Sequence, residues 1–188
     1  DLHFGHNLVA NTRGYSNTVD MDNDIAIQWR KQVAPNDRVI FLGDLTVNAS
    51  KVDYALGLID KLPGEKVLIT GNHDPVAPQH KKCFASYPEW SKHFSVILPF
   101  AHKKLSGNDV LLSHYPYAKY GDGPERAGAR YEQYRLPDLG LPLIHGHTHA
   151  KNRAYDRSLH VGWDAWGRLV SQTEVIDWLE CLNSNADT

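Results

Sequence analysis

Five short polar segments of this 188-residue chain carry side chains that commonly bind metal ions. They are Asp1-Leu2-His3, Gly43-Asp44, Gly71-Asn72-His73-Asp74, His114 and Gly146-His147-Thr148-His149. Their candidate ligands are two carboxylates, one amide oxygen and four imidazoles. Such mixed oxygen and nitrogen ligands suit zinc, manganese, iron or nickel, whereas calcium prefers oxygen alone. Seven ligands are too many for one tetrahedral ion, so the set predicts two ions that share a bridging carboxylate.

Each segment taken alone has a plainer explanation. An Asp-x-His triplet such as the one at Asp1 is common, and Gly43-Asp44 is compatible with an ordinary turn at the end of a strand. His114 alone is equally compatible with a hydrogen-bonded core histidine. Gly71-Asn72-His73-Asp74 is rarer, and His147-x-His149 has a familiar metal-binding spacing. All five segments together, in this order, make coincidence implausible.

The elements that must position these residues are short, apolar, β-branched runs. Five such runs predict strands, at 38–42, 66–70, 96–98, 110–113 and 141–144. Four of them are followed directly by one of the polar segments, and ligands of open α/β sheets bind outside the carboxyl ends of the strands. Asp1 has no strand before it in this sequence, so we expect the first strand of a single domain spanning residues 1–188 to precede residue 1.

Helices are predicted between the strands. Ile25, Trp29 and Val33 recur every four residues, which predicts an amphipathic helix over about 22–33 that stops before Pro35. Further apolar helical faces lie at 55–62 and 175–182. The alternation of strands and helices up to about residue 75 predicts parallel βαβ units. The second half is richer in turns, with a hairpin turn expected at 107–108 and strand pairing between 153–155 and 159–161.

Composition restricts the classes of partner. The formal net charge of −2 and the pI near 6.6 provide no basic surface for long nucleic acids, although a small nucleotide remains compatible. No run of about 18 apolar residues predicts a membrane span. Cys83 and Cys181 are far apart in the sequence, which favours reduced thiols in a cytoplasmic protein over a disulfide. The sequence does not indicate an oligomeric state.

The ordered segments resemble the calcineurin-like metallophosphoesterase superfamily. Its pattern is D-x-H, then G-D, then G-N-H-D/E, then H, then G-H-x-H, and this sequence matches every element between Asp1 and His149. The neighbouring residues, Phe4-Gly5-His6-Asn7 among them, resemble a small stand-alone branch of bacteria and their phages. Within that branch the chain resembles phosphodiesterases that open 2′,3′-cyclic nucleotides.

The resemblance implies a fold, a metal site and a location. The fold would be a four-layer α/β/β/α sandwich with two mixed sheets and the metals at the carboxyl edge of the strands. One ion would be held by Asp1, His3 and His149, and the other by Asn72, His114 and His147. Asp44 would bridge them. Manganese is the expected ion in vitro, with iron, zinc or nickel as alternatives, and the cytoplasm of a bacterial host is the expected location if a phage encodes the chain.

The expected reaction is hydrolysis of a phosphodiester by metal-activated hydroxide. His73 directly follows the ligand Asn72, so we predict that it reaches the phosphate and assists the leaving oxygen, with Asp74 orienting its ring. The superfamily likewise assigns the matching histidine to proton donation or phosphate binding. His6, Arg13 and Tyr115 are further candidates for contact with the substrate.

The expected substrate is a small nucleotide diester such as a 2′,3′-cyclic nucleotide. Two other functions compete with this one. The first is a phosphomonoesterase or protein phosphatase of the same fold, although a short chain leaves little room for a large protein-binding groove. The second is a non-catalytic metal-binding scaffold, which would usually have lost a ligand or the catalytic histidine, whereas this chain keeps both.

Overall fold

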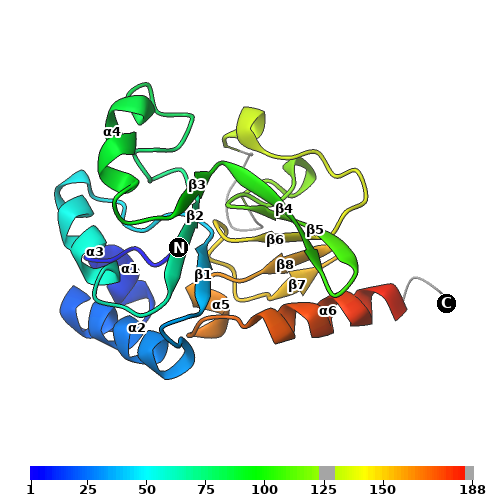
Figure 1. The fold of residues 1–188 in the computed structure, drawn as a ribbon, viewed down its shortest axis with the longest axis horizontal. Coiled ribbons are helices and arrows are strands. Elements are labelled where there is room, and N and C mark those ends of the chain that lie inside the picture. The colour runs from blue at the N-terminus through cyan, green and yellow to red at the C-terminus, as the bar shows by residue number, and fades with distance from the viewer. Residues whose placement is uncertain (123–129, 185–188) are drawn as a thin grey trace. The chain divides into compact units, whose positions relative to one another are not determined.

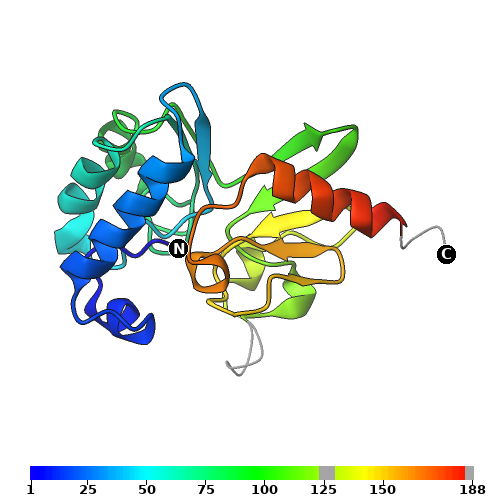
Figure 2. The same ribbon diagram turned by 90° about the horizontal axis from the view of Figure 1, so that it is seen from below.

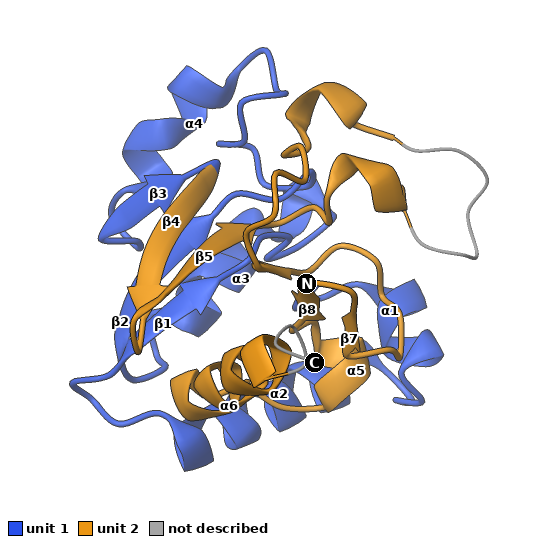
Figure 3. Cartoon of the chain, turned by 90° about the vertical axis from the view of Figure 1, so that its right-hand side faces the viewer, with its two compact units in different colours: residues 1–99 blue, residues 100–188 orange. Residues whose placement is uncertain are grey.

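The computed structural model describes residues 1–122 and 130–184. Contacts between Cα atoms divide the chain into two compact units, residues 1–99 and 100–188 (Figure 3). Each unit contains one β-sheet. Among the described residues, no helix is both long enough and apolar enough to cross a membrane.

The first unit is built on a three-stranded parallel sheet in the order β1-β2-β3. Its strands are β1 (Arg38–Phe41), β2 (Glu65–Ile69) and β3 (Val96–Leu98). Its helices are α1 (Asn7–Thr12), α2 (Thr18–Gln32), η1 (Ala49–Lys51), α3 (Val52–Ile59) and α4 (Cys83–Trp90). Helices α2 and α3 lie on the same side of this sheet (Figures 1 and 2). All three predicted strands of this unit are present, so the expected parallel arrangement is confirmed.

Aromatic packing joins α2 to this sheet. The Trp29 ring lies 5.3 Å from that of Phe41 on β1, and Phe41 in turn lies 5.4 Å from Phe94. The indole of Trp29 also donates a hydrogen bond to the Pro63 carbonyl oxygen at 2.9 Å. Helix α2 begins earlier than predicted because the side chain of Asn17 accepts a hydrogen bond from the Asp20 backbone and caps the helix.

The second unit is built on a five-stranded mixed sheet in the order β4-β5-β6-β8-β7. Its strands are β4 (Phe100–Leu105), β5 (Asn108–Ser113), β6 (Leu143–His145), β7 (Ala154–Tyr155) and β8 (Ser158–His160). Its helices are η2 (Ala118–Tyr120), η3 (Glu132–Tyr134), α5 (Trp163–Trp166) and α6 (Gln172–Ser184). Helix α6 lies alongside the sheet (Figures 1 and 2).

The hairpins of this second sheet were predicted from their turns. Strands β4 and β5 pair antiparallel, and so do β7 and β8. Strand β5 is parallel to β6, and β6 is parallel to β8, so their carboxyl ends lie at one edge of the sheet. The predicted α/β fold with two sheets is therefore confirmed, except that only the second sheet is mixed and the first is parallel throughout its described strands.

Candidate metal and phosphoester site

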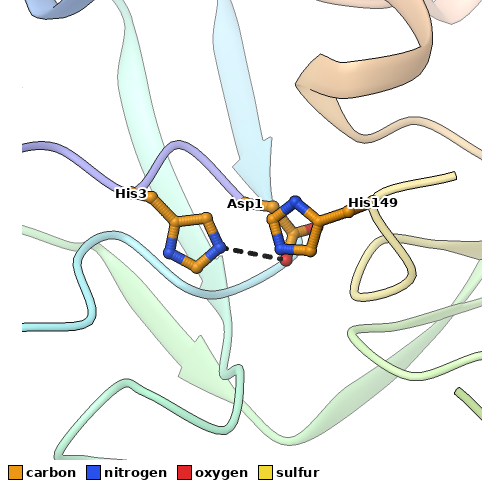
Figure 4. A group of neighbouring side chains, drawn as sticks. All are labelled: Asp1, His3 and His149. Carbon is orange, nitrogen blue, oxygen red and sulfur yellow. Dashed lines mark ion pairs between the residues drawn. The ribbon is translucent and has the colours of Figure 1, made fainter. Parts of the chain in front are cut away.

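In the first unit, Asp1, His3 and Asp44 bring their side chains together. His3 Nε2 lies 3.9 Å from Asp1 Oδ1 (Figure 4) and 4.0 Å from Asp44 Oδ2. Asp44 follows the carboxyl end of β1, and all three side chains are almost completely buried. Two charged carboxylates and an imidazole are costly to bury without compensation, so this arrangement is typical of groups that bind a cation.

Backbone hydrogen bonds hold the segment of Asp1 and His3 beside the turn after β1. The backbone N–H of His3 donates to the Asp44 carbonyl oxygen at 3.2 Å, and that of Phe4 donates to the Leu45 carbonyl oxygen at 2.9 Å. The hydroxyl of Thr46 donates to the Phe4 carbonyl oxygen at 2.8 Å. Neighbouring turns of one unit therefore fix the spacing of the candidate ligands.

Asp22 of α2 fixes the next turn of this segment. Its two carboxylate oxygens accept hydrogen bonds from the Gly5 backbone N–H at 3.1 and 3.2 Å. The Tyr54 hydroxyl also donates to Asp22 at 2.8 Å. Gly5 has φ of +69°, a conformation that strongly favours glycine, so the turn depends on both its residue type and this buried carboxylate.

The segment after β2 carries Asn72, His73 and Asp74. The His73 backbone N–H donates to Asp44 Oδ1 at 2.8 Å, and its ring Nε2 lies 4.0 Å from Asp44 Oδ2. The ring also makes an edge contact with His3 at 6.0 Å between centroids, while its side chain remains 38% exposed. His73 thus lies beside the candidate ligands with part of its ring accessible, and its contact with a substrate stays a prediction.

Asp74 has a different role from the one predicted for it. Its buried carboxylate accepts hydrogen bonds from the backbone N–H groups of Asp44, Leu45 and Gly71, at 2.8 to 3.0 Å. Burial, with the neighbouring charge of Asp44, raises the pKa of Asp74 above its ordinary value. Asp74 therefore ties the turn after β1 to the turn after β2, whereas its position next to His73 in the sequence predicted that it would orient the His73 ring.

In the second unit, the predicted ligands follow the parallel strands β5 and β6. His114 lies directly after β5, and its Nε2 is 3.1 Å from Nδ1 of His147. The two rings are nearly perpendicular, and both are buried. His149, which Figure 4 also draws, places its Nδ1 2.8 Å from Asp164 Oδ2. The parallel register of β5 and β6 explains why residues 33 positions apart in sequence meet at one sheet edge.

Backbone conformation also distinguishes the predicted ligands. Seven described non-glycine residues have positive φ, and four of them are His3, Asp44, His147 and His149, with φ between 54° and 69°. A left-handed backbone costs a non-glycine residue roughly 1–3 kcal/mol, and such residues cluster at functional sites. The strain therefore supports a functional role for these four positions.

The geometry of the first unit fits a bound ion. Two oxygen or nitrogen ligands of a first-row ion each lie about 2.0–2.2 Å from it, so they lie at most about 4.4 Å apart. The separations of 3.9 and 4.0 Å around His3 Nε2 are within this limit, and they exceed the length of a direct hydrogen bond. The donor set therefore has both the chemistry and the spacing that a metal requires.

Two predicted substrate contacts have structural partners instead. The Arg13 guanidinium donates hydrogen bonds to the carbonyl oxygens of Asp1 at 2.7 Å and Leu2 at 2.9 Å, so it supports the segment that carries the candidate ligands. The Tyr115 ring is 4% exposed and contacts the rings of His114 and His147, each at 4.9 Å. Both residues therefore support the site, contrary to the expectation of direct contact with substrate.

His6 remains a candidate for substrate contact. Its Nδ1 accepts a hydrogen bond from the Val9 backbone N–H at 3.3 Å and caps α1. The ring lies 6.2 Å from that of His3. A ring whose Nδ1 is an acceptor carries its proton on Nε2 when neutral, so His6 presents a hydrogen-bond donor beside the candidate ligands.

Two residues that the sequence analysis missed contact the predicted histidines. Asp122 Oδ1 lies 3.0 Å from His147 Nε2, and Asp164 contacts His149. Burial alone would raise the pKa of Asp122, but hydrogen bonds from Arg130 and His147 lower it to about 2. Neither aspartate belongs to the five polar segments. Asp122 lies in the stretch 115–137, which is polar and rich in aromatic residues and glycine and shows no clear helical or strand period in the sequence. Residues 123–129 of that segment lie outside the described structure.

Comparison with known proteins extends the resemblance across most of the chain. The family described as calcineurin-like phosphoesterase matches residues 1–151. The gene 66 protein of Mycobacterium phage L5 is 38% identical over 190 residues, covering 94% of this chain and 90% of that protein. An uncharacterized protein of Methanocaldococcus jannaschii, MJ1445, is 29% identical over 154 residues, and the alignment covers 81% of this chain and 68% of that protein.

A solved structure has a similar fold. The protein of unknown function AQ665 from Aquifex aeolicus aligns with a TM-score of 0.68 and 25% sequence identity, and the alignment covers 95% of each chain. Because the alignment covers 95% of each chain, the similarity of fold includes both units.

Proposed function

Because the chain belongs to the calcineurin-like phosphoesterase family, we propose that it is a dinuclear-metal phosphodiesterase acting on small nucleotide diesters such as 2′,3′-cyclic nucleotides. The observation that carries this proposal is His73, a partly exposed imidazole 4.0 Å from the Asp44 carboxylate. A scaffold that only binds metal has no need of an accessible acid beside its ligands. The phage relative favours the cytoplasm of a bacterial host as the place of action.

The proposed ligands are the seven residues that match the family's pattern. One ion is assigned to Asp1, His3 and His149, the other to Asn72, His114 and His147, and Asp44 is assigned to both. When bound, two such ions supply Lewis acidity, which lowers the pKa of water and neutralises the charge of the phosphate. Manganese is the ion we propose for assays, and iron, zinc and nickel suit the same mixed ligands.

The protein side chains are proposed to handle the leaving group. His73 is proposed to donate a proton to the departing oxygen, because its partly exposed ring lies beside the candidate ligands. His6 is proposed to donate a hydrogen bond from Nε2 to a phosphate oxygen. Arg13, Asp22 and Asp74 keep the ligand-bearing turns in place and make no proposed contact with substrate.

A substrate panel with purified protein and Mn²⁺ tests this proposal. The panel contains 2′,3′- and 3′,5′-cyclic nucleotides, linear dinucleotides, bis-p-nitrophenyl phosphate and p-nitrophenyl phosphate. The expected result is a kcat/KM for the diesters, with 2′,3′-cyclic nucleotides foremost, at least tenfold above that for the monoester. A preference for the monoester would replace the proposal with a phosphomonoesterase. No turnover with manganese, zinc, nickel or iron would contradict any enzymatic function.

A further inference from the structure

The two histidines of the Gly146–His149 segment each have a carboxylate on one ring nitrogen. Asp122 Oδ1 lies 3.0 Å from Nε2 of His147, and Asp164 Oδ2 lies 2.8 Å from Nδ1 of His149. The first carboxylate comes from 25 residues before its histidine and the second from 15 residues after it. All four residues belong to the second unit. Two independent segments therefore supply the same kind of partner to the two rings.

Asp122 is firmly held in its position. Its side chain is 1% exposed, Arg130 Nε donates to Oδ2 at 2.6 Å, and Arg135 donates to Oδ1. The buried guanidinium of Arg135 also donates to the carbonyl oxygens of Arg130 at 3.0 Å and Gly121 at 2.8 Å. Two arginines thus compensate the charge of Asp122 and prevent its rotation, which leaves Oδ1 directed at the His147 ring.

Asp164 is positioned by the short helix α5. Its side chain is 8% exposed. Trp166 donates from its indole to the His160 carbonyl oxygen at 2.7 Å, and Arg153 donates to the Ala165 carbonyl oxygen at 3.1 Å. Lys151 donates to the backbone carbonyl oxygen of Asp164 itself at 3.0 Å. These bonds tie α5 to the segments around β7 and β8, so the carboxylate approaches His149 from a fixed support.

A carboxylate on one nitrogen of a neutral imidazole determines where its proton resides. Asp122 places the proton of His147 on Nε2, which leaves the Nδ1 lone pair directed at His114 Nε2, 3.1 Å away. Asp164 places the proton of His149 on Nδ1, which leaves Nε2 as the acceptor. The two rings therefore present opposite nitrogens as electron-pair donors.

We propose that Asp122 and Asp164 are positioning residues, each of which sets the tautomer and ring orientation of one metal-binding histidine. This inference rests on the proposed dinuclear site, because His147 and His149 are assigned there to different ions. Carboxylates that accept from ligand histidines make the ligand more basic, and their removal typically weakens metal binding about 10- to 100-fold. The two aspartates should therefore control two separate binding events.

Asparagine variants test the proposal, since Asp122→Asn and Asp164→Asn retain the size of the side chain. Asp138→Asn is the matched control, because Asp138 pairs with Lys119 and accepts from the Gly140 backbone N–H without contacting a predicted ligand. Equilibrium titration with Mn²⁺ is expected to show 10- to 100-fold weaker binding of one ion in D122N and of the other ion in D164N. D138N should bind both ions like the wild type.

A second measurement separates positioning from general support of the loop. Long-range ¹H–¹⁵N correlation spectra of the metal-free protein should show the Nε2–H tautomer for His147 and the Nδ1–H tautomer for His149. The Arg130→Gln variant removes one partner of Asp122 but leaves its contact with His147, so it should keep the tautomer and most of the affinity. Opposite tautomers, or unchanged affinity in D122N and D164N, would overturn this inference alone. A wild-type protein that binds none of manganese, zinc, nickel and iron would overturn the proposed function as well.

Discussion

At the scale of single residues, a substitution of His73 can distinguish a role in catalysis from a role in metal binding. Its side chain is 38% exposed and its Nε2 lies 4.0 Å from Asp44, whereas the candidate ligand His3 is buried. We therefore predict that His73→Ala lowers kcat/KM for a diester by about 10²- to 10⁴-fold, the usual contribution of a general acid. Bound metal, measured by elemental analysis, should stay at the wild-type level. Metal loss in proportion to the activity loss would show that His73 is a ligand or a structural residue.

Substitution of Arg13, unlike that of His73, is expected to weaken metal binding. Its guanidinium donates to the carbonyl oxygens of Asp1 and Leu2, so its removal should loosen the segment that holds two candidate ligands. We predict that Arg13→Ala weakens Mn²⁺ binding and lowers the free energy of unfolding by about 1–3 kcal/mol. Isothermal titration and urea unfolding measure the two effects. A raised KM with unchanged metal binding and stability would instead support direct contact with the phosphate.

At the scale of elements, short segments around the predicted ligands were the most predictable. The apolar runs before Asp44 and Asn72 correspond to β1 and β2, and the run before His114 corresponds to β5. These runs are recognisable because a buried parallel strand needs continuous apolar residues and a ligand turn needs polar ones. Each such prediction depends on neighbours in sequence.

Partners distant in sequence could not be predicted in the same way. Asp74 is adjacent to His73 in sequence, yet its carboxylate binds the backbone of Asp44 and Leu45, 30 and 29 residues away. Asp122 and Asp164 lie 25 and 15 residues from the histidines that they contact. Helix α4 contains Pro88, and α1 is only six residues long, so neither has the periodicity that predicts a helix. These side-chain partners and these two helices depend on tertiary contacts, which local sequence patterns do not reveal.

The junction between β8 and α5 provides a prediction at this scale. A Cβ atom at Gly162 would lie 2.4 Å from Nε2 of the buried His160 ring. Because the ring is packed inside the second unit, Gly162→Ala should lower the free energy of unfolding by about 1–3 kcal/mol through overpacking. Gly57→Ala is the control, since Gly57 lies within α3 with no heavy atom within 4 Å of the added Cβ. Urea unfolding should show this control to be about 0.5–1 kcal/mol more stable than the wild type.

At the scale of the whole molecule, the buried histidines connect folding to pH. The rings of His145 and His160 stack at 5.4 Å, and Tyr155 contacts Nε2 of His145 at 2.9 Å. Burial lowers the pKa of His145 to about 3 and that of His160 to about 4, from an ordinary value of 6.5. Both rings are therefore neutral in the folded protein at pH 5, whereas in the unfolded chain they are protonated.

The sign of the pH dependence follows from this difference in bound protons. Below about pH 6.5 these two histidines bind more protons in the unfolded chain than in the folded protein, so their contribution to stability falls as the pH falls toward their pKa values in the folded state. Between pH 7 and pH 5 the loss should be roughly 2 kcal/mol for each histidine. Urea unfolding of the protein in EDTA measures this dependence without a contribution from metal release.

Variants assign the pH dependence to these two rings. The double variant His145→Gln and His160→Gln removes both titrations, so its free energy of unfolding should vary less with pH even if it is lower at pH 7. His102→Gln is the control, because His102 is exposed and pairs with Asp109 on the β4–β5 hairpin. It should retain the wild-type slope. A double variant with the full wild-type slope would mean that other groups carry the acid sensitivity, and that the buried histidines are accessible to protons in the folded protein.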